Sequence, residues 1–339
     1  MTGAVSLLSD HDRLEARRLI ESEGLRFETD ADDIVGLYDG ERLVATGSRA
    51  GYVLKMLAIA PDQQGGEALG ELVTLLMQRG MDAGHETFFV YTRPDHVTTF
   101  ERLNFRLLVT HSMAALLEIG PGIREYLDNH RALMRSGKNG AIVVNGNPFT
   151  LGHLHLAETA ARRVEHLYLF VVREDRSVFP FDARFRLARE ATAHLSGVTV
   201  LETSRYAVSA GTFPSYFLRR LDDAALAQMQ LDVRLFGSVL APPFSVRARF
   251  VGDEPYCATT AAYNRTMEEA LGEYGIEWTQ IPRLAHGDAA ISASRVREFL
   301  GRGDLDRVAS WVPPATMAYL RSPEGDNVIR RLAGAGEGR

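Results

Sequence analysis

The stretch that decides the fold runs Ala141-Ile142-Val143-Val144-Asn145-Gly146-Asn147-Pro148-Phe149-Thr150-Leu151-Gly152-His153. It reads as a buried strand, a tight loop and a helix that begins at Thr150 or just after it. Thr150 is expected to cap the helix, and Gly152 removes a side chain where something must approach the backbone. His153 then lies in the first turn, at the positive end of the helix dipole. The pattern therefore predicts an anion site at this helix start.

Further short apolar runs follow, separated by helical stretches: Leu167–Val172, Val198–Leu201, Val233–Phe236 and Ile276–Ile281. Short apolar runs that alternate with helices predict a parallel sheet covered on both faces. Ligands of such sheets bind beyond the carboxyl ends of the strands. We therefore expect a doubly wound, Rossmann-like α/β domain over residues 139–325, with a disordered tail at 326–339.

The first part of the chain has a different pattern, which predicts a mixed α+β domain over residues 1–120. The expected elements are a helix around Leu14–Ser22, strands at Ile34–Tyr38, Leu43–Ser48 and Tyr52–Ile59, a helix Leu69–Met81, a strand Thr87–Tyr91, a short helix through Phe100 and Leu103, and strands Phe105–Val109 and Met113–Glu118. Two groups of helix breakers, Gly120-Pro121-Gly122 and Ser136–Gly140, bracket a further helix from about Ile123 to Arg135. We place a linker helix there, at residues 121–138.

Length and composition limit the classes of protein. A chain of 339 residues exceeds the usual size of one hydrophobic core, so two domains are expected. The net charge of −6 and the pI of about 6.0 favour neither a nucleic-acid partner nor an acidic membrane surface. The only cysteine is Cys257, and neither a basic leader nor a membrane-length apolar run is present, so we expect a cytoplasmic protein. Lys55 and Lys138 are the only lysines, so any polyphosphate must be neutralised by Arg, His, backbone amides or a metal ion.

The Thr-x-Gly-His pattern after a first strand resembles the nucleotidyltransferase superfamily, whose members join a nucleoside triphosphate to an acceptor and release pyrophosphate. The resemblance implies that Thr150 and His153 contact phosphates. The second half of the superfamily pattern is Ile291-Ser292-Ala293-Ser294-Arg295-Val296-Arg297. Ser294 is expected to cap a helix that ends at Gly301, so that Ser292, Ser294 and Arg297 converge on the β- and γ-phosphates.

The order of elements in the front domain resembles the GNAT-type acetyltransferase fold, in which a Gly-rich turn before a helix binds the pyrophosphate of coenzyme A. The corresponding turn here is Gln64-Gly65-Gly66-Glu67-Ala68. Glu67 stands where that family has a small residue, and its carboxylate would repel a pyrophosphate unless it points away. The alternative interpretation is an ordinary helix start whose acidic residue suits the dipole. We expect Gln64, Gly65 and Gly66 to dock a prosthetic group and to catalyse no transfer.

Five segments together resemble the citrate lyase ligase family over nearly the whole chain: Gly140–His153, Leu169–Asp175, Thr212–Leu218, Arg249–Pro255 and Ile291–Arg297. The resemblance implies an ATP-dependent ligase that activates acetate as acetyl-AMP, with Mg²⁺ bound to ATP and no dedicated protein site for the metal. The acetyl group would pass to the phosphopantetheine-like thiol on the acyl carrier subunit of citrate lyase. Thr150, His153 and Arg297 are then the expected catalytic residues. The expected ATP-binding residues are Asn145, Asn147, Pro148, Phe149, Gly152, Arg173, Arg184, Gly252, Glu254, Ser292 and Ser294.

Two other functions use the same motifs. An adenylyltransferase of the pantetheine-phosphate or nicotinate-mononucleotide type would need them, although such enzymes ordinarily have no front domain. A nucleotide-binding regulator without catalysis would be favoured only if Thr150, His153 or Arg297 were missing, and all three are present. Cys257 is expected to pack as a small apolar residue at a helix start, because no histidine lies near it in the sequence. His155 is expected to face away from the site.

Overall fold

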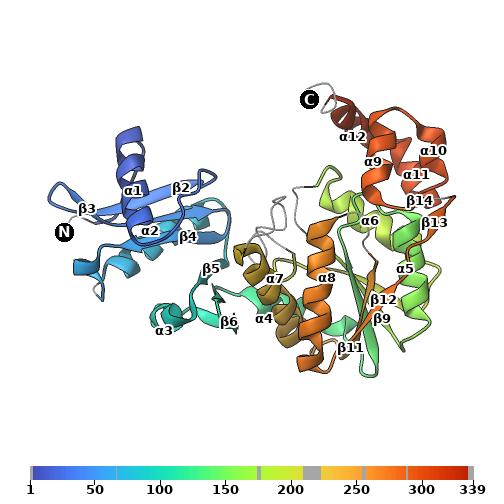
Figure 1. The fold of residues 1–339 in the computed structure, drawn as a ribbon, viewed down its shortest axis with the longest axis horizontal. Helices are drawn as coiled ribbons and strands as arrows, with labels where there is room; N and C mark the ends of the chain where they lie inside the picture. The colour runs from blue at the N-terminus through green and yellow to red at the C-terminus, as the bar shows by residue number, and fades with distance from the viewer. Residues whose placement is uncertain are drawn as a thin grey trace. The chain divides into compact units, whose positions relative to one another are not determined.

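The structure is a computed structural model and describes residues 3–65, 67–173, 177–208, 223–253, 257–287 and 289–334. The chain divides into two compact units, Met1–Asp128 (unit 1) and Asn129–Arg339 (unit 2), and Figure 1 follows it from end to end. Among the described residues, no helix is both long and apolar enough to cross a membrane.

Unit 1 is built on one seven-stranded sheet in the order β1-β2-β3-β4-β5-β7-β6. Its elements are β1 (Val5–Ser6), α1 (Asp10–Ser22), β2 (Asp33–Asp39), β3 (Arg42–Ala50), β4 (Val53–Ile59), α2 (Ala68–Asp82), β5 (Phe88–Thr92), α3 (Val97–Glu101), β6 (Arg106–His111) and β7 (Ala114–Ile119). The apolar face of α2 packs Leu72 and Leu76 into a core with Leu37, Leu54 and Phe88. Every expected strand of this part is present, but α3 ends at Glu101 and so leaves out Leu103.

The pairing of β4 with β5 sets the shape of unit 1. All other neighbours in this sheet are antiparallel, whereas β4 and β5 run parallel and pair only at Val53–Leu54 with Phe89–Val90. The helix α2 connects these two strands, as a parallel crossover requires. A mostly antiparallel sheet with one short parallel pair bridged by a helix is the acetyltransferase-like topology that the resemblance implies.

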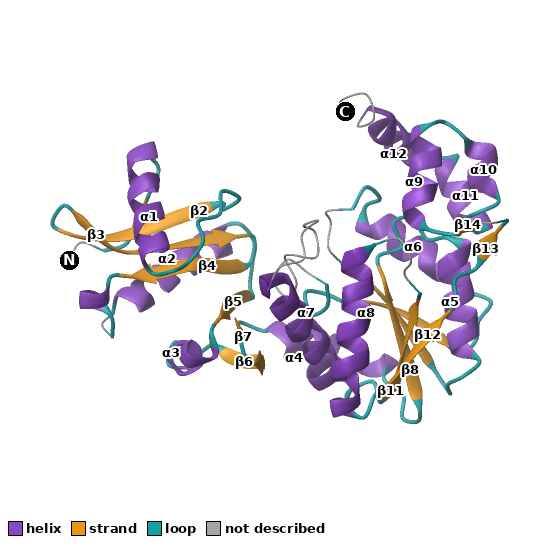
Figure 2. Ribbon diagram, in the orientation of Figure 1, coloured by secondary structure: helices purple, strands orange, loops and turns teal. Residues whose placement is uncertain are grey.

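A helix at the unit boundary leads into the parallel sheet of unit 2. The elements are α4 (Gly122–His130), β8 (Asn139–Val144), α5 (Leu151–Ala161), β9 (Leu167–Val171), α6 (Phe181–Thr192), β10 (Val198–Glu202), α7 (Asp223–Leu235), a π-helical turn (Phe236–Leu240), β11 (Val246–Gly252), α8 (Ala258–Ala270), β12 (Glu277–Ile281), β13 (Ala285–His286), β14 (Ala289–Ala290), α9 (Ala293–Gly301), α10 (Leu305–Ala309), α11 (Pro314–Leu320) and α12 (Pro323–Gly334). Figure 2 shows helices on both sides of the sheet, with α5 and α6 opposite α7 and α8.

The five main strands of unit 2 are all parallel, in the order β10-β9-β8-β11-β12. From β8 the chain first adds β9 and β10 on one side and later adds β11 and β12 on the other. The carboxyl end of β8 is therefore the point at which the strand order reverses, where doubly wound folds bind their ligands. This confirms the doubly wound α/β expectation for the second part of the chain.

Two expectations for unit 2 are wrong. Val233–Phe236 is not a strand, since it lies at the end of α7 and in the π-helical turn, and the strand that follows β10 along the chain is β11. A short apolar run fits a buried helix as well as a buried strand, so its pattern alone does not separate the two. The tail expected to be disordered begins inside α12, whose Val328 is buried while Ile329 and Leu332 pack on the core. Residues 335–339 lie outside the described ranges.

Candidate active site

A cavity of about 760 Å³ opens at the carboxyl ends of β8, β9, β11 and β12. The polar and charged residues among its described lining are Asn145, Asn147, Thr150, His153, His155, Arg249, Thr259, Thr260, Tyr263, Asn264, Arg283, Ser292, Ser294 and Arg297. No aspartate or glutamate is among those described lining residues. The cavity is thus a cationic and hydrogen-bonding site suited to anions.

The start of α5 closes one wall of the cavity and has the expected capping geometry. Thr150 is the N-cap in an extended conformation, and its hydroxyl accepts a hydrogen bond from the His153 amide at 3.4 Å. In return the Thr150 amide donates to His153 Nδ1 at 3.0 Å, which is a reciprocal capping box. The capping box therefore orients the His153 ring and also fixes the point at which the loop ends and α5 begins.

The hydrogen bond from Thr150 determines which nitrogen of His153 carries the proton. Because Nδ1 accepts from a backbone N–H, the proton of the neutral imidazole must be on Nε2. Burial, and secondarily the charge of Arg283, lower the pKa of His153 to about 4. His153 is therefore a neutral hydrogen-bond donor at physiological pH, and its ring centre lies 5.3 Å from that of the fully buried Phe149, with the two rings tilted by 31°.

The start of α9 lies on the same cavity, with its cap two residues earlier than expected. Ser292 is the N-cap, and its hydroxyl accepts from the Arg295 amide at 3.3 Å. Ser294, which we expected to be the cap, is inside the first turn and accepts from Arg297 Nη2 at 3.2 Å. Either serine can cap a helix, so the choice depends on how the preceding loop approaches the sheet.

Two contacts bring the starts of α5 and α9 together. Arg297 Nη1 donates to the main-chain oxygen of Asn147 at 2.5 Å, and burial lowers the pKa of this guanidinium from its ordinary value. A Cβ built on Gly152 would lie 3.1 Å from the main-chain oxygen of Ile291, so the missing side chain allows the loop before α9 to approach. Thr150, Gly152, His153, Ser292, Ser294 and Arg297 all line the one cavity.

The loop between β8 and α5 is held from behind by Arg184, which is fully buried. Its Nη1 donates to the main-chain oxygens of Asn145 and Val172 and to Asn145 Oδ1, at 2.7 to 2.9 Å, and its Nε donates to the oxygen of Phe179. Asn147 Oδ1 accepts from the Phe179 amide at 3.0 Å. Arg184 lies outside the cavity, so its role in this structure is to position the loop.

Several other expected ATP ligands are placed away from the cavity. Arg173 pairs with Glu202, and its guanidinium lies 4.6 Å from the centre of the Phe181 ring. Pro148 and Phe149 are buried residues of the loop and do not line the cavity, whereas Asn145, Asn147 and Gly252 do. Gly66 and Glu254 lie outside the described residues, as do Glu174 and Asp175 and the Thr212–Leu218 segment.

Some residues of the cavity were missed by reasoning from the sequence. His155 lines it rather than facing elsewhere, and Cys257 is exposed at the N-cap of α8 instead of packed. Arg283 lines it after β12, and its amide donates to Asp253 Oδ1 at 2.9 Å. Arg249 is a charged residue inside a buried strand, and a lone arginine within an apolar run is the sequence signal that indicates it.

The expected docking turn of unit 1 follows β4. Gln64 Nε2 donates to the main-chain oxygen of Ile59 at 3.2 Å and to Glu23 at 3.3 Å, and Gly65 has a φ of +83°. Glu67 is the N-cap of α2 and makes no side-chain capping hydrogen bond. The turn is thus held by Gln64, and Gly65 takes a backbone conformation that suits glycine.

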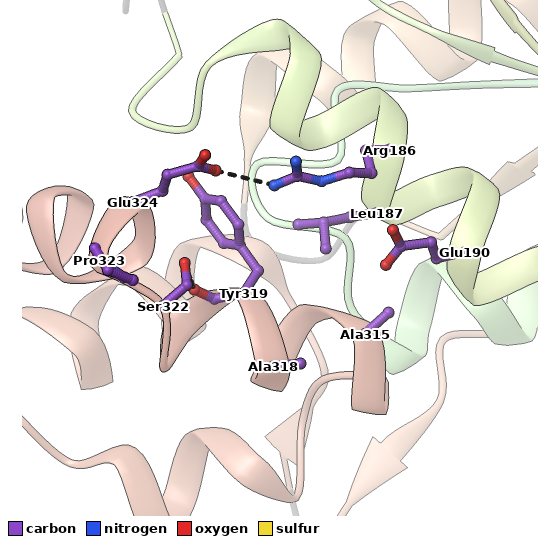
Figure 3. A pocket seen from close by; sticks show the side chains of 9 residues that line it. All are labelled: Arg186, Leu187, Glu190, Ala315, Ala318, Tyr319, Ser322, Pro323 and Glu324. Atoms are coloured by element: carbon purple, nitrogen blue, oxygen red, sulfur yellow. Dashed lines mark hydrogen bonds and ion pairs between the residues drawn. The ribbon is translucent and has the colours of Figure 1, made fainter.

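A second, shallower hollow of about 370 Å³ lies between α6 and the α11–α12 corner. Figure 3 shows Arg186 and Glu324 reaching toward each other across it, with Tyr319 beneath them. None of the expected site residues lines it. The candidate active site of unit 2 is therefore the cavity at the strand ends.

Comparison with known proteins matches residues 139–320 to the citrate lyase ligase C-terminal domain. The [citrate [pro-3S]-lyase] ligase of Klebsiella pneumoniae is 36% identical over 93% of this chain and 95% of its own length. That of Escherichia coli K12 is 32% identical over 91% and 90%. A phosphopantetheine adenylyltransferase of Streptococcus gordonii is 31% identical over 31% of this chain and 68% of its own length.

Proposed function

The chain belongs to the citrate lyase ligase family, and from that premise we propose that the cavity of unit 2 binds ATP and acetate and forms acetyl-AMP there. The enzyme is a ligase that makes an acyl–thiol bond and activates citrate lyase by acetylation. The observation that carries the proposal is the hydrogen bond from Arg297 to Asn147, which joins two helix starts at one cavity. Helix starts at the end of a parallel sheet are suited to bind phosphates.

The first step is a displacement at the α-phosphorus of ATP. A bond forms between a carboxylate oxygen of acetate and the α-phosphorus, the bond to the β-phosphate oxygen breaks, and pyrophosphate leaves. Arg297 and the first-turn amides of α5 and α9 neutralise the phosphates, while the Nε2–H of His153 donates to the oxygen on which charge accumulates. Magnesium would be held by the phosphate oxygens of ATP, because the described lining of the cavity offers no carboxylate.

The second step transfers the acetyl group to the prosthetic-group thiol of the citrate lyase acyl carrier subunit. The thiol sulfur bonds to the acetyl carbon, the bond to AMP breaks, and the thiol proton is released to solvent. We propose that Gln64, Gly65 and Gly66 of unit 1 dock the phosphopantetheine-like arm. The exposed Glu67 at the α2 start disfavours a second pyrophosphate in that position.

The test is exchange of labelled pyrophosphate into ATP by the full chain, with acetate present or absent. Acetate-dependent exchange, followed by acetylation of a deacetylated citrate lyase carrier, is the expected result. Exchange that needs phosphopantetheine in place of acetate would contradict the proposal and favour an adenylyltransferase. A phosphopantetheine adenylyltransferase is the shorter relative that matches under a third of this chain. Exchange without any acceptor would also contradict it.

A further inference from the structure

Arg249 is a buried cation on the wall of the cavity that the two-step chemistry above does not use. It lies in β11, is 4% exposed and lines the cavity. Its neighbour Phe250 packs into the core with Ile142, on the face of the sheet that α5 covers. Because side chains alternate along a strand, Arg249 points to the opposite face, where its guanidinium lies 4.3 Å from the centre of the Phe236 ring. Figure 2 shows α7 and α8 on that side of the sheet.

Two nitrogens of the Arg249 guanidinium lack a hydrogen bond within the described residues, although a buried charge requires such bonds. Its Nε and Nη1 are buried and have no hydrogen-bond partner within the described part of the chain. The nearby carboxylate of Asp232 accepts from the Val208 amide at 2.7 Å and from the Tyr263 hydroxyl at 2.5 Å. Burial lowers the pKa of Arg249 to about 10, against the opposing effect of Tyr263 and Asp232, so it stays charged at neutral pH.

A buried charge with incomplete hydrogen bonds is costly, and contact with an aromatic ring offsets only part of that cost. An unsatisfied buried polar group in a folded protein calls for an explanation, and a bound ion is one of those that the physics allows. The cavity wall on this side also contains the apolar side chains Val208, Val251 and Met267. An arginine beside small apolar walls suits an anion with a short hydrocarbon part.

We propose that Arg249 binds the carboxylate of the acyl substrate and so forms a short-monocarboxylate subsite on the α8 side of the cavity. The inference rests on the proposed ligase function. The phosphates of ATP are the other anion of the proposed reaction in this cavity. Their proposed partners belong to α5 and α9, whose apolar side chains, such as Ala157 and Val296, share the core cluster of Phe250 on the other face of the sheet. A planar guanidinium forms paired hydrogen bonds with a carboxylate, which would place its oxygen for attack on the α-phosphorus.

The test compares Arg249→Met with the wild type in acetate-dependent pyrophosphate exchange, varying acetate and ATP separately. The half-saturating acetate concentration should rise roughly 30-fold or more, the usual effect of removing one partner of a buried charged hydrogen bond. The half-saturating ATP concentration should change less than about threefold. Arg297→Met should show the reverse pattern. Arg247→Met, an exposed arginine on the same strand, is the matched control and should alter neither.

Two outcomes overturn the subsite. A higher half-saturating ATP concentration with an unchanged acetate value would assign Arg249 to the nucleotide. If neither value changes, Arg249 has only a structural role in its contact with Phe236. If Arg249→Met does not fold, Arg249→Lys replaces it in the test, because lysine keeps the charge but cannot form the paired hydrogen bonds, so the acetate constant should still rise. A higher acetate constant with ATP unaffected supports the subsite, and an unaltered acetate constant contradicts it. Failure of wild-type exchange to depend on acetate would instead contradict the ligase proposal itself.

Discussion

Arg297 donates a hydrogen bond from Nη1 to the main-chain oxygen of Asn147, 2.5 Å away and 150 residues earlier in the chain. This contact ties the start of α9 to the loop that precedes α5. The Arg297 guanidinium is held on its other side by Ser294. The proposed phosphate site therefore depends on contact between the loop before α5 and the start of α9, which the folded sheet of unit 2 brings together.

His153 should act as a neutral donor, and two substitutions separate this role from that of a cation. His153→Ala is expected to slow acetate-dependent pyrophosphate exchange by roughly 10²–10³, the usual loss when one preorganised donor is removed. His153→Gln should retain more activity than His153→Ala, because the Gln amide places an N–H near the position of Nε2. Equal rates for both variants would contradict a role for the Nε2–H, provided that both melt near the wild-type temperature.

The lowered pKa of His153 also predicts how stability depends on pH. Between its ordinary value near 6.5 and the folded value of about 4, the unfolded chain binds a proton at this residue and the folded chain does not. Falling pH across that interval therefore destabilises the wild type through His153. The melting temperature of His153→Gln should fall less between pH 7 and pH 5 than that of the wild type. Parallel decreases in the two proteins would show that His153 is not held neutral.

Arg184 should matter for stability and for nucleotide binding, although it lies outside the cavity. Arg184→Met removes the donor of several buried acceptors, and each acceptor left unpaired costs roughly 1–3 kcal/mol. We expect lower stability in chemical denaturation and a higher ATP constant in exchange. Arg173→Met is the control, because its exposed guanidinium pairs with Glu202 away from the cavity, and it should alter the ATP constant little.

Gly152→Ala should disturb the close contact between the start of α5 and the loop before α9. The added Cβ would lie 3.1 Å from the main-chain oxygen of Ile291, so the loop before α9 must shift by a few tenths of an ångström. Since a small misplacement of reacting groups can cost about 10²-fold in rate, exchange should fall by roughly 10-fold to 100-fold. Gly272→Ala has open space around the new Cβ and serves as the control. Full exchange activity in Gly152→Ala would contradict this prediction, because the reaction would then tolerate the shift of the loop before α9.

The sequence alone was enough for features that depend on neighbouring residues. The run from Ala141 to His153 predicted the strand, the loop and the helix start with its Thr150 cap, because a capping hydrogen bond spans only three residues. The alternation of short apolar runs with helices predicted a parallel sheet for the same reason, since the pattern reports the burial of each segment separately. The order of elements likewise predicted the topology of unit 1.

Tertiary structure decided the features in which one segment depends on a distant one. It selected Ser292 over Ser294 as the cap of α9 and made Val233–Phe236 the end of a helix, because in each case two local solutions are similar in energy and packing chooses between them. It also moved Arg184 behind the loop and Arg173 away from the cavity, and placed Arg249 in the wall. Burial and the direction of a side chain are properties of the assembled sheet. The position of an arginine in the sequence therefore does not say which of these places its side chain takes.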